Sequence, residues 1–505
     1  MMPRPLARIG LALLCLWSIS AARADDGPSE MPAFGDPSTA VDLSGQVTLE
    51  NCVAQALGRN FNVKIQWFVV QQSEDSVVIQ QAAFEPTFGF NANKTVDQTA
   101  TSQAIPGTIP YTSITSSTFS LSDTVITGGT VAASYDLGRE YFAPEYSLPD
   151  PAYGSTVSLN VTQPLLNGAG TDYNRAGIEN ARLGVRISNL NFKSAVLTMI
   201  LNVETTYYNL LFQREQYNVQ LEQLKQAQQL LDENTIRRET GVQTDLDVAN
   251  ARAGVASAKN LLILDEQAVH NSEDDLLQLL GDRQFTTVVG ATSFPFVGEP
   301  EVSFDRSYKL ARDNGPNLAV AQATIDQFKL AALKAKRSML PTLNLNGGLG
   351  YSSYASTAGS AITGNWSGYN WTAGLTVSVP WGLTAGRAAY RQAVAGVRSE
   401  QVAYDQTDQG LVVAVRAAVR AVQTGIASVR SSAENTQYAQ KAYELTKAQF
   451  DAGLATSYLV LQAQNTLETA RVSELQAKVN LLSAIANLRF LEGSSLQLYR
   501  INLPE

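Results

Sequence analysis

The most regular pattern in the chain is an apolar residue at alternating steps of four and three positions. A long series of this kind starts at Val196 and continues to Leu231. A second series, without a polar exception, consists of Val412, Val415, Val419, Val422, Ile426, Val429 and Ala433. Heptads sustained over many turns are typical of helices that pack as coiled coils. We therefore predict two very long helices, over 174–239 and 387–450, each reaching roughly 100 Å at the usual rise per residue.

A tight turn that contains a glycine follows each long helix. Gly241 and Gly453 mark these turns, and an apolar heptad resumes beyond the first of them. Each long helix and its returning helix are therefore expected to form an antiparallel hairpin. The returning helices are shorter than the outgoing ones. We expect the preceding helices, 48–84 and 304–339, to stack end to end with them, and the second of these to break at Pro316.

Between the preceding helix and the long helix of each half, apolar residues alternate with small polar ones. From 371 to 379 every odd-numbered residue is apolar, and every even-numbered residue is Thr, Gly or Ser. Period two predicts strands with one apolar and one polar face. Uncharged segments of about ten residues with aromatic ends fit a transmembrane β-barrel better than a soluble sandwich. The candidates for an interfacial aromatic belt are Phe88, Phe90, Tyr351, Trp366, Tyr369, Trp371 and Trp381.

The same order of segments occurs twice along the chain. We place the first copy at 48–281, an irregular link at 282–303, the second copy at 304–493 and a C-terminal tail at 494–505. Each copy is expected to contain a helix, strands, a long helix, a turn and a returning helix. Three sets of residues match in the same order, each at its own constant offset: Asn62 and Pro86 with Asn317 and Pro341, then Pro164, Gly170 and Arg175 with Pro380, Gly386 and Arg391, then Gly241 and Thr244 with Gly453 and Thr456.

The first copy contains extra sequence between its two clear strands. Residues 119–122 and 130–137 have the pattern of a hairpin around Gly128 and Gly129. Two interpretations remain open for this segment. It is either an external loop, which is the interpretation we favour, or a pair of additional barrel strands.

The first residues of the chain have the pattern of an export signal. Arginines precede the apolar run 9–20, and an A-x-A cleavage motif ends at Ala24. We expect 1–24 to be a signal peptide and 25–47 to be an N-terminal linker. Cys52 is then the only cysteine of the mature chain, so an internal disulfide is excluded and stability must come from packing.

Charge and strand number narrow the classes of function. The net charge of the full chain is −9, and no basic stripe is visible, so nucleic acid is a poor partner.

No continuous apolar run long enough for a spanning helix follows the expected signal, so a membrane crossing would use strands. Four strands cannot close a transmembrane barrel, which needs about eight. Several chains must therefore share one barrel; three would supply about twelve strands, or about eighteen if the hairpin contributes, and closure alone leaves two or four chains open.

Three motifs, together with the duplicated order of segments, carry a resemblance to a known family. They are Val161-Thr-Gln-Pro164 with Gly170, the first turn Gly241-x-x-Thr244-x-x-Asp247-Val248-x-x-Ala251, and the second turn Phe450-x-x-Gly453-x-x-Thr456 through Ala463. In their order and spacing they resemble the TolC-type outer membrane factors. The resemblance covers nearly all of the mature chain.

The resemblance implies an α+β membrane protein that forms a homotrimer. Its strands would build a shared transmembrane β-barrel in the lipid of a Gram-negative outer membrane, and its hairpins a periplasmic α-helical barrel with an equatorial belt. The protein would contact a periplasmic adaptor protein and, through the adaptor, an inner-membrane pump. The hairpin tips that would meet the adaptor are Gly241, Val242, Gln243, Thr244, Gly453, Leu454, Ala455 and Thr456.

The expected gate departs from the family pattern. The aspartate pair that the family carries beyond the second turn is replaced by Leu459 and Gln462. The family's tyrosine and arginine tethers are also absent. We expect an uncharged or apolar constriction around Leu459, with acidic residues of the first turn nearby; the alternative is that Leu459 packs between helices. The gate candidates are Asp245, Asp247, Phe450, Leu459 and Gln462.

Residues for enzymatic chemistry are scarce. His270 is the only histidine, which argues against the usual zinc sites and His-based triads. We expect no enzymatic activity, cofactor or metal. The predicted function is an outer-membrane channel for export, of small molecules in the version we favour. The alternatives are the outer-membrane duct of type I protein secretion and a non-conducting periplasmic coiled-coil structural protein.

Overall fold

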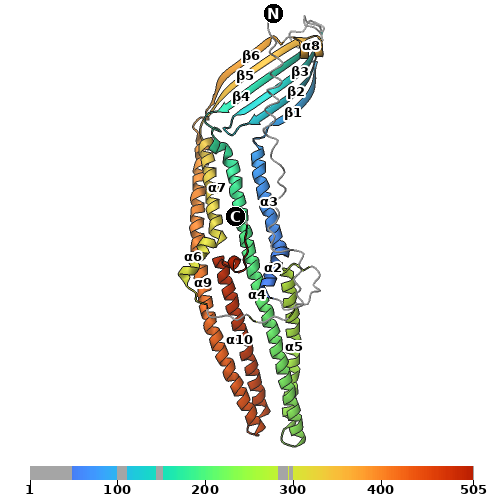
Figure 1. The fold of residues 1–505 in the computed structure, drawn as a ribbon, viewed down its shortest axis with the longest axis vertical. Coiled ribbons are helices and arrows are strands. Elements are labelled where there is room, and N and C mark those ends of the chain that lie inside the picture. The colour runs from blue at the N-terminus through green and yellow to red at the C-terminus, as the bar shows by residue number, and fades with distance from the viewer. Residues whose placement is uncertain are drawn as a thin grey trace.

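The computed structural model describes residues 48–98, 111–143, 152–282, 290, 294, 300–364 and 366–503. They form an elongated molecule with one β-sheet at one end and long helices running away from it (Figure 1). The fold is therefore of the α+β class. The expected signal peptide, the N-terminal linker, most of the link 282–303 and the end of the tail lie outside the described residues.

The six strands of the described residues belong to one antiparallel sheet, in which they lie in chain order. The last strand of the first half pairs with the first strand of the second half, so that Val157 lies opposite Tyr351. Both halves of the chain thus contribute to a single sheet whose two edges are its first and last strands. The strands are β1 (Thr87–Asp97), β2 (Tyr111–Thr124), β3 (Thr130–Ala143), β4 (Ala152–Pro164), β5 (Thr342–Ala355) and β6 (Gly368–Ser378).

The hairpin in the first half is part of this sheet. β2 pairs with β3 along its whole length and with β1 from Thr112 to Ser122, and β3 also pairs with β4. The prediction of an external loop is therefore wrong, and the segment adds two strands to the sheet. The reason is visible in β2, where nine of the fourteen residues are serine or threonine and three of these lie on the same face as Phe119 and Leu121, so that the alternation that reveals a strand is weak.

The two long helices occur as predicted. α4 (Thr171–Glu239) has 69 residues and α9 (Thr384–Asp451) has 68. Each ends at a tight turn and is followed by a shorter antiparallel helix, α5 (Asp245–Leu279) and α10 (Ser457–Glu492) respectively. α4 packs against α5 and α10 packs against α9, and the two hairpins meet where α10 packs against α4.

Nearer to the sheet, two other helices take the places of the returning helices. α3 (Phe61–Ala82) packs on α4 above α5, and α7 (Pro316–Ser338) lies between α4 and α9 above α10 (Figure 1). The end-to-end stacking that the sequence predicted is therefore confirmed. The shorter helices are α2 (Leu49–Arg59), α6 (Phe304–Asn314), α8 (Ala358–Thr363) and α11 (Ser495–Leu498).

The first helix differs from the prediction, which ran without a break over 48–84. It divides at Asn60 into α2 and α3, because Asn60 has an extended backbone with φ −58° and ψ 129°. The Oδ1 atom of Asn60 accepts hydrogen bonds from the backbone N–H groups of Asn62 and Val63, at 2.9 and 3.3 Å. An asparagine that caps the following helix in this way competes with helix continuation. The predicted break of the second helix occurs between α6 and α7, at Gly315 and Pro316.

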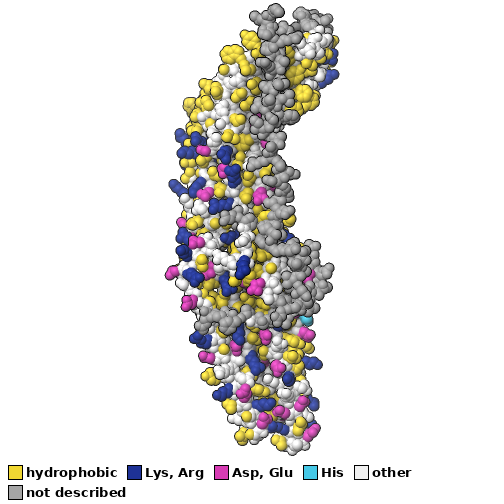
Figure 2. Space-filling view, viewed as in Figure 1, with side chains coloured by type: hydrophobic (Ala, Val, Ile, Leu, Met, Phe, Trp, Pro, Cys, Tyr) yellow, Lys and Arg dark blue, Asp and Glu magenta, His cyan; other side chains and the backbone are white. Residues whose placement is uncertain are grey.

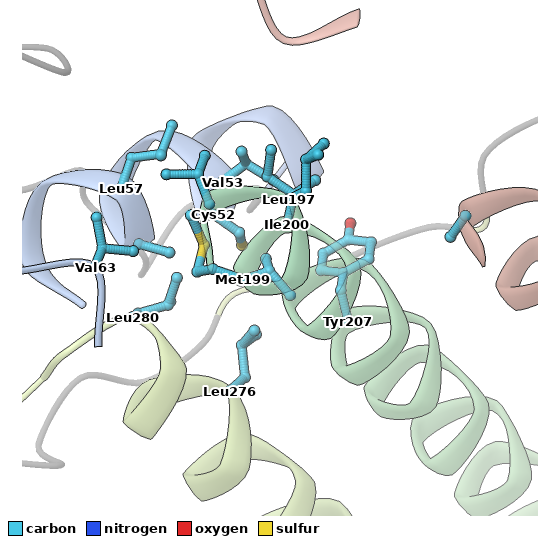
Figure 3. Close-up of a cluster of buried hydrophobic side chains, with 14 of the residues drawn as sticks. Cys52, Val53, Leu57, Val63, Leu197, Met199, Ile200, Tyr207, Leu276 and Leu280 are labelled. Carbon is cyan, nitrogen blue, oxygen red and sulfur yellow. The ribbon is translucent and has the colours of Figure 1, made fainter. Parts of the chain in front are cut away.

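The largest hydrophobic core lies at mid-length, where α2 meets the long hairpin. Figure 3 shows Cys52 of α2 among the side chains of Leu197 and Ile200 of α4 and Leu276 of α5. Cys52 is fully buried, and this burial raises the pKa of its thiol to about 12. The cysteine is therefore a small apolar core residue rather than a reactive thiol.

Candidate functional site: the sheet faces and the hairpin tips

The sheet has two chemically different faces because successive side chains point to opposite sides of a strand. Register places the even-numbered residues of β1 on the same side as the odd-numbered residues of the other strands. We call this side the apolar face. Its large exposed side chains include Phe88, Phe90, Phe119, Leu121, Val157, Leu159, Val161, Leu345, Leu349, Tyr351, Tyr369, Trp371, Leu375 and Val377. A continuous exposed surface of this kind marks contact with another apolar phase.

The opposite side, the polar face, consists mainly of Ser, Thr, Asn and Gly. The hydroxyls of Ser134 and Ser158 lie 2.8 Å apart across β3 and β4. The Nδ2 atom of Asn346 donates to the hydroxyl of Thr376 at 2.9 Å across β5 and β6. Hydrogen-bonded small polar side chains on one face and apolar ones on the other are typical of a barrel with an aqueous lumen. Figure 2 shows that charged side chains, frequent over the helices, are sparse over the sheet.

The aromatic belt candidates lie at two levels of the sheet. Phe88 and Phe90 are in the half of β1 next to the helices, and the ring centroids of Phe90 and Phe119 are 4.8 Å apart. Tyr351 and Tyr369 lie opposite each other near the far end of β5 and β6.

The tryptophan candidates occupy three different settings. Trp371 is on the apolar face of β6, opposite Leu349. Trp381 lies beyond the end of β6 and is fully exposed. Trp366 precedes β6, and its Nε1 donates to the carbonyl of Ile362 at 3.1 Å. Only the first of the three is therefore a strand residue.

The two hairpin tips have the same backbone geometry. Gly241 and Gly453 adopt φ of +80° and +77°, a left-handed conformation that favours glycine. The amide of the next residue closes each turn at 2.8 Å, Val242 to the carbonyl of Arg237 and Leu454 to that of Gln449. The hydroxyls of Thr244 and Thr456 then cap the returning helices α5 and α10. All eight predicted tip residues therefore lie at the end of the molecule opposite to the sheet.

The tips of the two hairpins are joined within one chain by Arg237. Its Nη1 donates to the carbonyl oxygen of Phe450 at 2.9 Å, and its Nη2 lies 3.3 Å from a carboxylate oxygen of Asp451. The guanidinium also stacks over the Phe450 ring, at 4.2 Å from the centroid. One turn away, the Nδ2 atom of buried Asn234 donates to the hydroxyl of Ser457 at 2.6 Å. α4 is thus fastened to both helices of the second hairpin.

Three of the five gate candidates, Phe450, Asp245 and Asp247, have side-chain contacts within the chain. Phe450 is fully buried inside the chain, so it acts by packing. Asp247 forms a capping box with Thr244, and Asp245 pairs with Arg238, whose Nε is 2.6 Å from its carboxylate. Leu459 and Gln462 are exposed on α10. Packing of Leu459 between helices of its own chain is therefore not observed. The bridging roles of Arg237 and Asn234 were not predicted from the sequence, because their hydrogen-bond partners lie more than 200 positions away along the chain.

The sequence of this chain matches the profile of a known protein family. The profile described as "Outer membrane efflux protein" matches residues 52–282 and 307–494, which is most of the chain. The chain belongs to the outer membrane efflux protein family. Membership confirms the resemblance to TolC-type factors. It also places the protein in the outer membrane of a Gram-negative cell, from which it extends into the periplasm.

Individual outer-membrane proteins are similar to this chain in sequence or in structure. "Pyoverdine export outer membrane protein OpmQ" of Pseudomonas putida is 26% identical over 321 residues, which are 62% of this chain and 66% of the relative, slightly less than two thirds. "Outer membrane protein TolC" of Escherichia coli is 24% identical over 350 residues, which are 67% of this chain and 69% of the relative. A solved structure of the outer-membrane channel OprN has a TM-score of 0.68 at 15% identity, covering 93% of this chain and 97% of that one. This last likeness is one of fold.

Proposed function

We propose that the protein is the outer-membrane channel subunit of a tripartite export machine. The observation that carries this proposal is the pairing of an open, apolar-faced sheet with long helical hairpins in a member of the outer membrane efflux protein family. The sheet would cross the outer membrane, and the helices would extend the duct through the periplasm. The two ranges that match the family profile agree with the two copies read from the sequence, so we also infer a tandem duplication.

The functional unit in this proposal is a homotrimer. Among the described residues of one chain, β1 and β6 are unpaired edges, and unpaired edges are not tolerated in lipid. Six strands are fewer than the roughly eight that close a small barrel. Three chains joined β1 to β6 would supply about eighteen, within the range of transmembrane barrels. The strand hairpin β2–β3 thus raises the expected number from twelve.

Exposed apolar residues on the helices at the two sides of the helical layer also support assembly with further copies of the chain. α9 contains an 18-residue window that is apolar enough, by length and composition alone, for a membrane span, yet only 22% of it is buried in one chain. α9 is at one side of the helical layer and α3 and α5 are at the other. Exposed apolar residues on these helices include Ile65, Phe68, Ile263, Leu264, Val402, Val413, Tyr438 and Leu445. Neighbouring chains in a closed α-barrel would cover them.

The partners would be a periplasmic adaptor and, through it, an inner-membrane pump. The hairpin tips expose the large apolar side chains of Val242, Leu246, Leu454 and Tyr458, which a monomeric surface seldom leaves uncovered. Two hairpins of the same turn geometry in each of three chains would present six similar tips. A six-membered adaptor ring would match that arrangement.

Small-molecule export is the cargo class that we favour. A relative named for export of pyoverdine, rather than of a protein, supports it. A duct for type I protein secretion would use the same architecture, because the pump rather than the duct selects the cargo. The non-conducting periplasmic protein is not favoured, because a spacer has no use for an apolar sheet face.

The test of the channel proposal is electron microscopy of the protein purified in detergent. We expect particles with threefold symmetry, a central lumen and a helical part roughly 100 Å long. Monomers, or rods without a lumen, would remove the closure argument and with it the proposed function.

The narrowest point of the duct is proposed at the hairpin tips. Leu459 and Gln462 are exposed on α10 close to the tip, and neither is charged. If they line the closed mouth, Leu459→Ala and Gln462→Ala widen it and raise the single-channel conductance in planar bilayers. Phe450→Leu, at a buried position, is the comparison for a general packing defect. Unchanged conductance in both exposed variants would exclude this constriction.

A further inference from the structure

Basic residues are nearly absent from the sheet, and the two that occur lie in one row. Lys94 of β1 and Arg139 of β3 are the only Lys or Arg residues within the six strands. Register pairs Lys94 with Thr115 of β2, and Thr115 with Arg139. Since all three belong to the apolar face, two strand spacings of about 4.8 Å separate the two cations. Side chains of their length can therefore reach a common anion.

This row lies near the end of the sheet that is farthest from the helices. Only three residues of β1 follow Lys94 and only four of β3 follow Arg139. In Figure 2 the dark-blue side chains over the sheet are found at this far end. A cation on a lipid-facing surface is costly at mid-membrane but is tolerated at the interface, where it can extend toward the headgroups. The row is thus at the level where a headgroup is expected.

Within the part of the chain that the structure describes, no acidic side chain pairs with either cation of the row. Lys94 and Arg139 are exposed, and within the described residues neither forms an ion pair. The only acidic residue on the apolar face of the six strands is Asp123, eight positions along β2 from Thr115, which is roughly 27 Å at the usual rise. The other strand acids, Asp97, Asp136 and Glu140, belong to the polar face.

Tyrosines lie at the same level on the same face. The Arg139 guanidinium is 5.9 Å from the ring centroid of Tyr153, its cross-strand neighbour. The rings of Tyr111 and Tyr141 meet edge to face at 5.9 Å. Tyrosine is a residue of membrane interfaces, with its ring against apolar groups and its hydroxyl toward polar ones. Cations and tyrosines together match a lipid that carries an anionic head on an apolar body.

We propose that Lys94, Thr115 and Arg139 bind the phosphate-bearing head of a phosphorylated glycolipid in the outer leaflet. The guanidinium and the ammonium donate charge-assisted hydrogen bonds to phosphate oxygens, and the Thr115 hydroxyl adds a donor between them. An open row on an apolar face suits a lipid, whose chains cover the neighbouring residues, better than free phosphate. This inference rests on the proposed contact of the apolar face with lipid.

The test compares three forms of the delipidated, detergent-purified full-length protein. They are the wild type, the double variant Lys94→Gln/Arg139→Gln, and the control Arg420→Gln/Lys441→Gln, which removes the same charge from exposed positions of α9. Each is titrated with diphosphorylated lipid A and with the same lipid after dephosphorylation, and binding is counted by native mass spectrometry. We expect the double variant to bind the phosphorylated lipid roughly tenfold more weakly than the wild type and the control.

The proposal would be overturned by equal binding of the phosphorylated lipid to the double variant and the wild type, or by equal binding of both lipid forms to the wild type. Displacement of the lipid by inorganic phosphate at equal concentration would also overturn it, because the row would then be a site for a free anion. Single-channel conductance of the same preparations separates this proposal from the channel itself. A conducting wild type with unselective lipid binding defeats only the lipid site, whereas a wild type that forms no channel defeats the proposed function.

Discussion

At the residue scale, Glu204 shows how one buried carboxylate fastens the C-terminal tail to α4. Glu204 is fully buried, and its Oε1 accepts a hydrogen bond of 2.6 Å from the hydroxyl of Tyr499. Its Oε2 has no hydrogen-bond partner among the described residues. Burial raises the pKa of Glu204, while Tyr499 and the nearby cation Arg489 lower it in part. The carboxyl group of Glu204 therefore resists ionisation in the folded protein.

Glu204→Gln is expected to stabilise the protein at high pH and to have little effect at low pH. The folded pKa of Glu204 lies above the unfolded value of 4.5. Below the unfolded pKa the carboxyl is protonated in both states, and the stability falls as pH rises through the folded pKa, because the unfolded state ionises more readily. Glutamine keeps the acceptor for Tyr499 and removes this loss.

The measurement is the melting temperature of the detergent-solubilised protein at several pH values between about 4.5 and 8. We expect the melting temperature of the variant to exceed that of the wild type by an amount that grows with pH. Tyr499→Phe, which removes the donor, should increase the sensitivity of the wild-type carboxylate to pH. A difference between Glu204→Gln and wild type that is independent of pH would show that ionisation of Glu204 plays no part.

At the element scale, the stacking of helices depends on two glycine caps. Gly281 ends α5 with φ +71°, and a Cβ there would lie 2.8 Å from the carbonyl oxygen of Arg59. Gly493 ends α10 with φ +66°, and a Cβ there would lie 3.0 Å from the Cβ of Asn314. In both halves the capping glycine thus contacts a junction between two helices, α2 with α3 in the first half and α6 with α7 in the second. The backbone can approach this closely only because no side chain intervenes.

Gly493→Ala is expected to destabilise the protein by about 1 to 2 kcal/mol, since a left-handed conformation disfavours a Cβ by about that amount. The contact with Asn314 adds to this loss. Gly184→Ala is the control, because Gly184 lies inside α4 with nothing within 4 Å of the added Cβ. Alanine there should be neutral or stabilising by roughly 0.5 to 1 kcal/mol. Chemical denaturation followed by circular dichroism compares the two; equal midpoints would refute the role given to the cap.

At the scale of the whole molecule, one chain is an incomplete structure. In the described part of the chain, most large side chains on the apolar face of the sheet are exposed, both sheet edges are open, and the outer helices expose apolar residues. These features have a common explanation if edge β1 of one chain pairs with edge β6 of the next. In the proposed trimer, such pairing would close a ring of about eighteen strands.

Cysteine crosslinking between the sheet edges is expected to give covalent trimers. Asn91→Cys on β1 is combined in turn with Asn370→Cys, Thr372→Cys and Gly374→Cys on β6, which samples the unknown register between chains. The natural Cys52 is buried and free, so it contributes little background. Oxidation of at least one double variant should yield species of up to three chains on a denaturing gel, and single variants should not. A limit at two chains, or a ladder beyond three, would contradict the trimer.

The sequence by itself determined the features that depend on local periodicity. Heptads defined α4 and α9, the glycines defined the two tips, and period-two alternation defined the strands that have a clear apolar face. The placement of the shorter helices followed from comparing lengths. In all these cases neighbouring residues along the chain carry the information, since a helix or strand imposes a fixed spacing on its buried face.

The tertiary structure decided what depends on residues that are far apart in sequence. The weakly patterned β2 became a strand because β1 and β3 supply its hydrogen bonds. Arg237 became a bridge between hairpins, and Phe450 a buried residue beneath it, because α4 and α9 end at the same tip. Lys94 and Arg139, unremarkable 45 positions apart in the printed sequence, form one row only through strand register. Pairing and packing bring such residues together, and no local periodicity encodes them.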